Sequence, residues 1–327
     1  MKKFFKIIGY IIGGVIILVI AFLIYFNAKY PQVDPPSNEK VEITPARVER
    51  GKYLTQHVSI CVDCHSSRDW TKYAGPLIAG TLGKGGEKYD EAAAGIPGVL
   101  YAKNITPTAL GSWSDGEIMR AITCGVSKDN TALFPLMPYT GFSKLSKEDL
   151  YSIVAYLRSL PAIKNDIPER SLNFPLNLIV KTMPFKTYSP SPEPNRNNPI
   201  EYGKYLVTIA NCFDCHTQMV KGDFIKGKEF AGGFEFHFPF GVVRSANITP
   251  DANTGIGSWT KEQFIQRFKS MDADSNQAAS IGTTDFNTPM PWTLFGGMSR
   301  EDLGAIYDYL KTIKPVNNVV VRFTPNQ

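Results

Sequence analysis

The sequence has no surplus of either charge outside its first thirty residues. The 327 residues include 35 basic and 30 acidic side chains, but four lysines and no acid lie in residues 1–30, which leaves 31 basic against 30 acidic residues elsewhere. A protein that binds nucleic acid needs Lys and Arg clustered on one face to contact the phosphates. The near balance of charge therefore argues against DNA and RNA as partners.

The sequence also has little of the polar, low-complexity composition that is typical of disordered chains. Hydrophobic residues make up 43% of it and aromatic residues 12%, which is a globular composition. At roughly 100 to 150 residues per domain, this length allows two or three compact domains, each with its own core. One small domain alone is excluded.

One apolar run is long enough to cross a membrane. Residues 7–26 carry no charge, and at about 1.5 Å per residue a helix of this length crosses the roughly 30 Å hydrocarbon core. The alternative is a cleaved signal peptide, but its apolar stretch usually has about 7 to 15 residues and ends in a small-residue cleavage site, which residues 26–30 lack. Three lysines precede the run and one follows it. The positive-inside rule therefore predicts an N-terminal membrane anchor over residues 1–30, in a single pass, with the rest of the chain in the periplasm.

Cysteine is scarce, and its placement is specific. Four of the five cysteines form two C-x-x-C-H motifs, one with Cys61, Cys64 and His65 and one with Cys212, Cys215 and His216. This spacing is the attachment signal of haem c, because two thiols add to the two vinyl groups on one porphyrin edge and the adjacent histidine lies under the iron as its proximal ligand. The motifs predict two covalently bound haem c groups.

Two other kinds of site use similar cysteine spacings. A redox C-x-x-C does not need a histidine directly after it, and a zinc site made from both motifs would not require their flanking sequences to match. The flanking sequences do match, which favours haem. The fifth cysteine, Cys124, is expected to be a small buried residue rather than a reactive one.

The chain contains an internal repeat, which indicates two copies of one domain. The paired segments, in the same order in both halves, are RGKYL (50–54) with YGKYL (202–206), NITP (104–107) with NITP (247–250), GSW (111–113) with GSW (257–259), LMPY (136–139) with PMPW (289–292), and SKEDL (146–150) with SREDL (299–303). We place the two domains at residues 46–165 and 199–317. Between them, residues 166–198 form a Pro-rich linker whose end, residues 189–199, is expected to be a stiff, solvated connector. Its apolar part, residues 174–185, fits either packing across a domain surface or facing a partner.

Both copies carry helix signals at equivalent places. Ser114 with Glu117, and Thr260 with Gln263, have the spacing of a capping box. Helix starts at Ser146 and Ser299 lead into apolar residues at i, i+3, i+4 and i+7, which is the pattern of one buried helical face. The sequence therefore predicts a mainly helical fold.

Each haem iron needs a sixth ligand or an open position, and two methionines are placed to supply one. Met137 and Met290 occupy equivalent Met-Pro segments just before the last helix of each copy. A lone methionine is more often core filler, but the matched position favours axial ligation by these two. The other histidines, His57 and His237, have no counterpart in the other copy and are expected to be surface or loop residues.

Other repeated residues are candidates for contacts with the haem edge. Trp113 and Trp259 offer indole N–H donors, and Asn104 and Asn247 offer amides, to the anionic propionates. The alternatives are plain packing for the tryptophans and an Asx turn for the asparagines.

With these motifs, the chain resembles two class I cytochrome c domains in tandem. More narrowly, it is similar to the membrane-bound cytochrome c subunits of periplasmic alcohol, gluconate and related dehydrogenases. The similarity covers residues 46–317. The motifs that carry it are CVDCH, CFDCH, NITP with GSW, the Met-Pro segments and SKEDL/SREDL. Those subunits often have three haem motifs, whereas this chain has two. The resemblance implies that a proline carbonyl holds the proximal imidazole. Pro76 fits that place, and Lys228 stands there in the second copy, which implies that the two irons are tuned differently.

The resemblance implies an electron-transfer protein rather than an enzyme. Its redox partners would be a periplasmic dehydrogenase as donor and a quinone-linked or terminal oxidase complex as acceptor, with electrons passing singly through two six-coordinate haems. The alternative is a dihaem redox enzyme, peroxidase-like or thiosulfate-oxidising, in which one haem opens its sixth site. A haem-based sensor is a third reading, without a signalling domain to support it.

Overall fold

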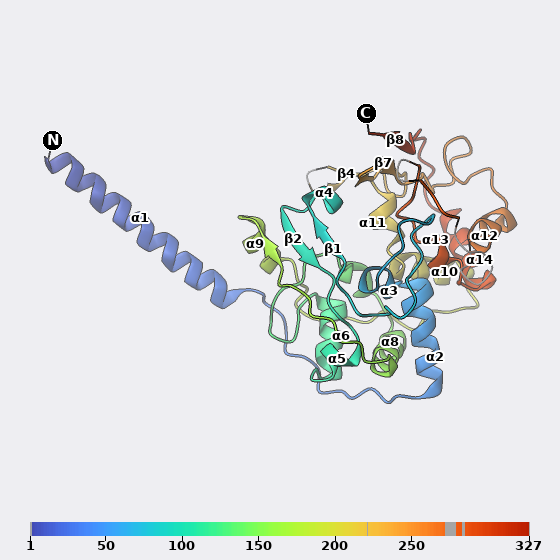
Figure 1. The fold of residues 1–327 in the computed structure, drawn as a ribbon, viewed down its shortest axis with the longest axis horizontal. Helices are drawn as coiled ribbons and strands as arrows, with labels where there is room; N and C mark the ends of the chain where they lie inside the picture. The colour runs from blue at the N-terminus through green and yellow to red at the C-terminus, as the bar shows by residue number, and fades with distance from the viewer. Residues whose placement is uncertain (1, 221, 272–278, 283–284, 327) are drawn as a thin grey trace.

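The computed structural model describes residues 2–220, 222–271, 279–282 and 285–326. Helix α1, Lys2–Lys29, projects from the rest of the protein and has no buried residue (Figure 1). Within the described residues, it is the one helix that is long and apolar enough to cross a membrane, a test that a signal sequence also passes. The predicted helix over residues 7–26 is confirmed as a helix, and its membrane insertion stays a prediction.

The body of the protein consists of two similar helical halves. The first half contains α2 (Pro45–Tyr53), the π-helix η1 (Leu54–Val58), α3 (Cys61–His65), α4 (Glu91–Ala94), α5 (Pro107–Leu110), α6 (Asp115–Cys124), α7 (Tyr139–Phe142) and α8 (Lys147–Ser159). The second half contains α10 (Pro199–Ile209), α11 (Cys212–His216), α12 (Lys261–Lys269), α13 (Trp292–Phe295) and α14 (Arg300–Leu310). The mainly helical fold expected from the sequence is confirmed.

The sequence reasoning missed three small antiparallel sheets. One has the order β1 (Lys88–Asp90), β2 (Gly98–Tyr101), β3 (Ser171–Leu172), one pairs β4 (Met219–Val220) with β5 (Asp223–Phe224), and one has the order β6 (Glu235–Phe238), β7 (Gly241–Arg244), β8 (Phe323–Pro325). These strands have two to four residues each. Segments this short carry too little alternation to be recognised from sequence.

The predicted helix starts are present. Ser114 and Thr260 form complete capping boxes at the starts of α6 and α12. Ser146 and Ser299 cap α8 and α14, each accepting a hydrogen bond from the backbone N–H three residues later. These side chains satisfy backbone donors that the first helical turn leaves free.

The repeated glycine of the Gly-Lys-Tyr-Leu motif allows the first and last helices of each half to cross closely. A Cβ atom on Gly51 would lie 1.9 Å from the carbonyl oxygen of Ser152 in α8, and one on Gly203 would lie 1.9 Å from that of Ala305 in α14. Any larger residue would therefore force the helices α2 and α8, or α10 and α14, apart. The following leucines, Leu54 and Leu206, are fully buried in the core.

The two halves exchange equivalent contacts across their interface. The Tyr53 hydroxyl donates to Asp302 at 2.7 Å and accepts from the Ser299 backbone N–H. The Tyr205 hydroxyl donates to Asp149 at 2.6 Å and accepts from the Ser146 backbone N–H. Each tyrosine thus lies at the start of the last helix of the opposite half. The repeated sequence therefore produces a repeated interface.

A second contact between the halves joins loop residues. The Asn287 side chain, which is 1% exposed, accepts from the Ala74 backbone N–H and donates to the carbonyl oxygens of Trp70 and Lys72. The backbone of Tyr73 also donates to the Ala279 carbonyl. One buried amide therefore holds the loop after the first C-x-x-C-H motif against the second half.

The linker up to Tyr188 packs on the first half, which is one of the two alternatives given for its apolar part, whereas residues 189–199 are mostly exposed, as expected of a solvated connector. Strand β3 extends the sheet of β1 and β2, and the short helices α9 (Leu176–Ile179) and η2 (Val180–Thr182) follow it, with Val180 fully buried. The Phe185 backbone N–H donates to the Cys124 carbonyl, and the Tyr188 hydroxyl donates to the Leu145 carbonyl.

The segment before the first half is ordered in the same way. Residues 31–44 are extended over its surface, with the Val41 N–H donating to Asp115 at 2.9 Å. A Cβ on Gly116 would lie 1.8 Å from the Ser37 carbonyl oxygen, so this glycine permits the close approach. The first half therefore extends beyond the predicted start at residue 46.

The two interfacial tyrosines differ in what their removal would leave behind. Without Tyr205, Asp149 keeps both hydrogen bonds from the Arg50 guanidinium, at 2.8 and 2.9 Å, whereas without Tyr53, Asp302 keeps only the Tyr202 hydroxyl at 3.2 Å. We expect Tyr53→Phe to lower stability by about 2 kcal/mol, and Tyr205→Phe by about 1 kcal/mol, because a buried carboxylate left short of donors carries the larger penalty. Thermal unfolding of the two variants in one detergent checks the order, and an equal or larger loss in Tyr205→Phe contradicts it.

Candidate haem attachment sites

Both C-x-x-C-H motifs lie on a single helical turn that follows a left-handed residue. Ile60 has φ 41° and ψ 42° before α3, and Asn211 has φ 54° and ψ 35° before α11. This conformation reverses the chain direction between the preceding helix and the motif. Asparagine adopts it readily, whereas a β-branched isoleucine is an outlier there. The fold therefore imposes the same turn in both halves, on a residue that disfavours it in the first.

The two imidazoles are held in one tautomer by carbonyl oxygens. His65 Nδ1 lies 2.6 Å from the Lys103 carbonyl oxygen, and His216 Nδ1 lies 2.8 Å from that of Ala246. A carbonyl only accepts, so Nδ1 must carry the hydrogen and Nε2 presents a free lone pair. Burial lowers the pKa of both rings, that of His216 to about 4, which favours the neutral form. A neutral imidazole with a free Nε2 is what a metal ligand requires.

The predicted partner of the imidazole is wrong. The Pro76 carbonyl accepts from the Asp69 backbone N–H instead, and the Lys228 carbonyl accepts from that of Ala231. The actual acceptors, Lys103 and Ala246, directly precede the repeated NITP segments. The match between those segments was the sequence feature that could have indicated a shared acceptor position. The two imidazoles are therefore held alike, and the difference inferred from Pro76 and Lys228 does not exist.

The asparagines of the NITP segments hold these carbonyls in place. Asn104 Oδ1 accepts from the backbone N–H and the hydroxyl of Thr106, and Asn247 Oδ1 accepts in the same way from Thr249. The first amide also donates to the Ile163 carbonyl and the second to the Val316 carbonyl, both at 2.8 Å.

Each asparagine therefore ties the segment beside the imidazole to the chain after the last helix. Both side chains are 5% exposed. The contacts are those of an Asx turn, which is the alternative given above, and a contact with the haem edge stays a prediction.

Each pair of thiols shares its helical turn with the imidazole that follows. The four motif cysteines are free, and no cluster of three or more His, Cys, Asp or Glu side chains with metal-binding geometry occurs among the described residues. The motifs do not combine into a zinc cluster, whereas thiols one turn apart and an adjacent imidazole fit the edge and the iron of one porphyrin. Cys124 is buried, as expected.

The two motifs lie close enough to influence each other. Loss of water contact around the sulfur raises the pKa of the Cys215 thiol to about 12, and the charges of Asp214, and of Asp63 and Cys64 in the first motif, add to the rise. Charges influence each other to this extent only over short distances, since screening is strong beyond about 10 Å. The charges of the first motif therefore influence Cys215 in the second motif.

The acidic residue inside each motif is a real difference between the two sites. Asp63 forms an ion pair with Arg68 at 2.9 Å. Asp214 has no ion pair within the described part of the chain, and burial raises its pKa to about 6. Burial raises the pKa of Asp63 as well, although the Arg68 charge opposes the rise. The two sites therefore differ in the ion-pair partner of this carboxylate.

The two candidate axial methionines occupy the same backbone context. Met137 and Met290 are partly buried and pack against the core, and each is followed by a proline of nearly the same conformation, Pro138 at φ −81°, ψ 56° and Pro291 at φ −80°, ψ 64°. In both segments, the methionine carbonyl accepts a 2.8 Å hydrogen bond from the N–H two residues later. The matched geometry indicates a common role, and axial ligation stays a prediction.

The tryptophans and the remaining histidines have different surroundings. Trp113 packs against the core and Trp259 is 36% exposed, so their predicted contact with the haem edge stays a prediction. His237 lies on β6 with its side chain largely exposed, as expected. His57 is not a surface or loop residue, because it lies in η1 with its Nδ1 2.8 Å from the Leu294 carbonyl and its ring against Gly297 of the other half.

Comparisons with known proteins agree with this geometry. Residues 200–314 match the cytochrome c family. The chain is 29% identical over 289 residues to the cytochrome c subunit of a quinone alcohol dehydrogenase from Gluconacetobacter polyoxogenes, covering 83% of this chain and 57% of that protein. It is 27% identical over 285 residues to the gluconate 2-dehydrogenase cytochrome c subunit of Pantoea cypripedii, covering 82% and 60%.

A third relative is similar to this chain over more of its own length. The chain is 27% identical over 269 residues to a dihaem cytochrome c-type protein of Cereibacter sphaeroides, covering 78% of this chain and 82% of that protein. By contrast, the chain spans little more than half the length of the dehydrogenase subunits. Residues 200–314 are similar to cytochrome c domains, and the chain as a whole resembles the cytochrome c subunits of alcohol, gluconate and fructose dehydrogenases.

Proposed function

We propose that this protein is a dihaem cytochrome c that transfers single electrons at the periplasmic face of the cytoplasmic membrane. In this proposal, residues 46–165 and 199–317 are two tandem class I cytochrome c domains. The observation that carries it is the pair of matched sites, each with two thiols on one helical turn and an imidazole whose Nδ1 is fixed by a carbonyl. The chain provides the same attachment chemistry twice.

In this proposal, two cysteines and one histidine hold each haem. When bound, haem iron supplies one-electron redox chemistry by changing between its ferric and ferrous states. Cys61 and Cys64 attach the first haem, and His65 Nε2 is its proximal ligand. Cys212, Cys215 and His216 do the same for the second.

Met137 and Met290 are the proposed sixth ligands, one for each half. Together with the imidazoles, their thioethers would complete the ligand set of each iron, which would raise the potential and leave no open position for a substrate. The matched Met-Pro conformation supports this assignment. We therefore propose electron transfer rather than catalysis on a substrate.

The proposed partner is a dehydrogenase that delivers electrons singly to this chain. The relatives named as subunits of alcohol and gluconate dehydrogenases support this class of donor. The proximity of the two motifs supports transfer between the haems. Helix α1 would hold the protein at the membrane, where a quinone-linked or terminal oxidase complex is the proposed acceptor.

The number of covalent haems tests this proposal directly. We expect two haems per wild-type chain, one in Cys61→Ala/Cys64→Ala and one in Cys212→Ala/Cys215→Ala, because each pair of thiols attaches one porphyrin. The measurement is the pyridine haemochrome content per chain, with peroxidase staining after a denaturing gel. Cys124→Ala is the matched control and should keep two haems, since this cysteine is buried away from both motifs. A wild-type chain without bound haem contradicts the proposed function.

Replacing a proposed axial methionine should change one potential only. We expect Met137→His and Met290→His each to lower the potential of one haem by on the order of 0.1 V or more, because a methionine ligand raises it and axial ligands set potentials over about 0.8 V. The measurement is a spectroelectrochemical titration. Met298→Leu, at a buried core methionine, is the control with both potentials kept. Two unchanged potentials in Met290→His rule out ligation by that residue.

The asparagine that supports each carbonyl should influence its own haem. We expect Asn247→Ala to lower stability by about 2 kcal/mol, because buried partners lose their hydrogen bonds. It should also shift one haem potential through the altered hydrogen bond to His216. Asn104→Ala should shift the other potential, and the exposed Asn253→Ala should shift neither. A loss of stability with both potentials unchanged would leave these asparagines a purely structural role.

A further inference from the structure

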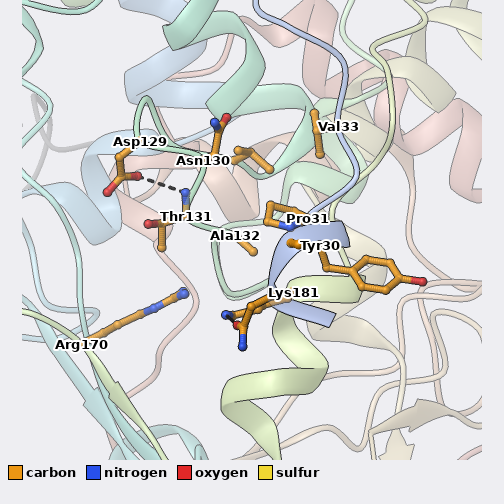
Figure 2. Close-up of a pocket in the computed structure, with 12 residues that line it drawn as sticks. Tyr30, Pro31, Val33, Asp129, Asn130, Thr131, Ala132, Arg170 and Lys181 are labelled. Carbon is orange, nitrogen blue, oxygen red and sulfur yellow. Dashed lines mark hydrogen bonds between the residues drawn. The ribbon is translucent and has the colours of Figure 1, made fainter. Parts of the chain in front are cut away.

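A polar cavity of about 550 Å³ lies where helix α1 meets the first half (Figure 2). Its lining comes from three parts of the chain, namely the end of α1 with the residues after it, residues 126–132, and the linker residues Arg170 and Lys181. Figure 2 shows the side chains of Arg170 and Lys181 approaching the cavity from the same side, below Thr131 and Ala132. The cavity belongs to neither haem site.

The cavity is lined by two cationic side chains and one carboxylate, so its basic groups outnumber its acidic one. Among the described residues, the half-buried Arg170 guanidinium has no hydrogen-bond or ion-pair partner, although the charges of Asp129 and Glu169 reach it. The Asp129 carboxylate is already engaged by the Ser127 hydroxyl and the Thr131 backbone N–H. The Lys181 ammonium donates to the Asn27 side chain at the end of α1. A partly buried guanidinium without a partner is suited to bidentate binding of a phosphate.

The cavity lies at the level expected for lipid headgroups. Helix α1 has 28 residues, about 42 Å at 1.5 Å per residue, so its ends extend beyond a hydrocarbon core of roughly 30 Å. The end nearest the body carries Tyr25, Lys29 and Tyr30, which are the residue types that gather at a membrane interface. Tyr30 also lines the cavity.

Apolar side chains are exposed on the segment between the two cationic residues. Phe174 is 78% exposed and Ile179 is 46% exposed, on the segment that contains α9 and leads to Lys181. In Figure 1, α9 lies at the end of the body from which α1 emerges. An aromatic and an aliphatic side chain next to cations, at the base of an apolar helix, form the composition of an interfacial membrane contact.

We propose that residues 170–181 form a second membrane contact, in which Phe174 and Ile179 enter the bilayer interface while Arg170 and Lys181 bind the phosphate of an anionic phospholipid. This inference rests on the proposed anchoring by α1. One helix alone allows the haem units to rotate and tilt freely above the membrane. A second contact fixes which face of the protein lies on the bilayer and which face is open to a redox partner.

The depth of Phe174 is measured on the full, haem-loaded chain in liposomes of phosphatidylglycerol and phosphatidylcholine. Single cysteines for spin labelling are placed at residue 174, at Val319 and at Val15 in a Cys124→Ser background, since the motif cysteines are consumed by haem. Val319 is the matched control because it is 81% exposed in the second half. We expect the label at 174 to favour collisions with oxygen, as at Val15, and the label at 319 to favour a water-soluble nickel chelate.

Headgroup binding is measured as the association of spin-labelled phosphatidylglycerol relative to phosphatidylcholine. Each basic residue near an anionic surface contributes about 1 kcal/mol, which is roughly a fivefold change, so Arg170→Gln/Lys181→Gln should lose most of the preference. Lys204→Gln/Lys314→Gln, at exposed lysines of the second half, is the matched control and should keep it. Excess inorganic phosphate should not compete if the ligand is a lipid headgroup, and competition would instead identify a free-phosphate site.

The outcomes separate this inference from the proposed function. The membrane contact alone is overturned if the label at 174 is as accessible to the nickel chelate as the label at 319. In that outcome, the label at Val15 still lies in lipid and both haems are still attached. Shielding of residue 174 only after a dehydrogenase is added would identify a protein-binding surface instead, and also overturns it. A chain without haem but with 174 in the bilayer would reject the proposed function and keep the membrane contact.

Discussion

The hydrogen bond from the imidazole of each C-x-x-C-H motif to a peptide carbonyl is the constraint on which the rest of the structure depends. It fixes the tautomer and the direction of the free nitrogen at both sites. The carbonyls of Lys103 and Ala246 stay in place because the next residue is a buried asparagine tied to the chain after the last helix. That helix in turn lies against the first helix of its half, at a glycine. The repeated motifs therefore follow one chain of contacts, from the imidazole through the carbonyl and the asparagine to the last helix and the first helix.

The two halves share these hydrogen bonds, but the partners of their buried carboxylates differ. At the interface, Asp149 has a guanidinium partner, whereas Asp302 relies on tyrosine hydroxyls. Within the motifs, Asp63 is paired with Arg68, whereas Asp214 has no ion pair in the described part of the chain. Because an uncompensated carboxylate stabilises the positively charged, oxidised state of a nearby centre, any difference between the two haem potentials is better sought in these charges than in the imidazole hydrogen bonds.

Much of the site was predictable from short motifs, but the residues that hold its imidazoles in place could not be predicted. The C-x-x-C-H spacing identifies thiols and proximal histidines because all of these groups lie on one helical turn. The acceptor of each imidazole lies 38 or 30 residues away in sequence. A backbone carbonyl carries no side-chain signature, so the Pro76 assignment failed. His57 was misjudged for a similar reason, since its partner, the Leu294 carbonyl, lies in a part of the chain that only folding brings near.

The sequence by itself determined the elements whose causes are local. Helix caps, the apolar length of α1, the cysteine spacing and the order of the repeat all depend on residues a few positions apart or on direct comparison of two segments. The tertiary structure decided how the halves face each other, which carbonyl holds each imidazole, and that Arg170 and Lys181 meet at the base of α1. Those features depend on contacts between distant segments, and their energies come from burial and hydrogen bonding that no local pattern encodes.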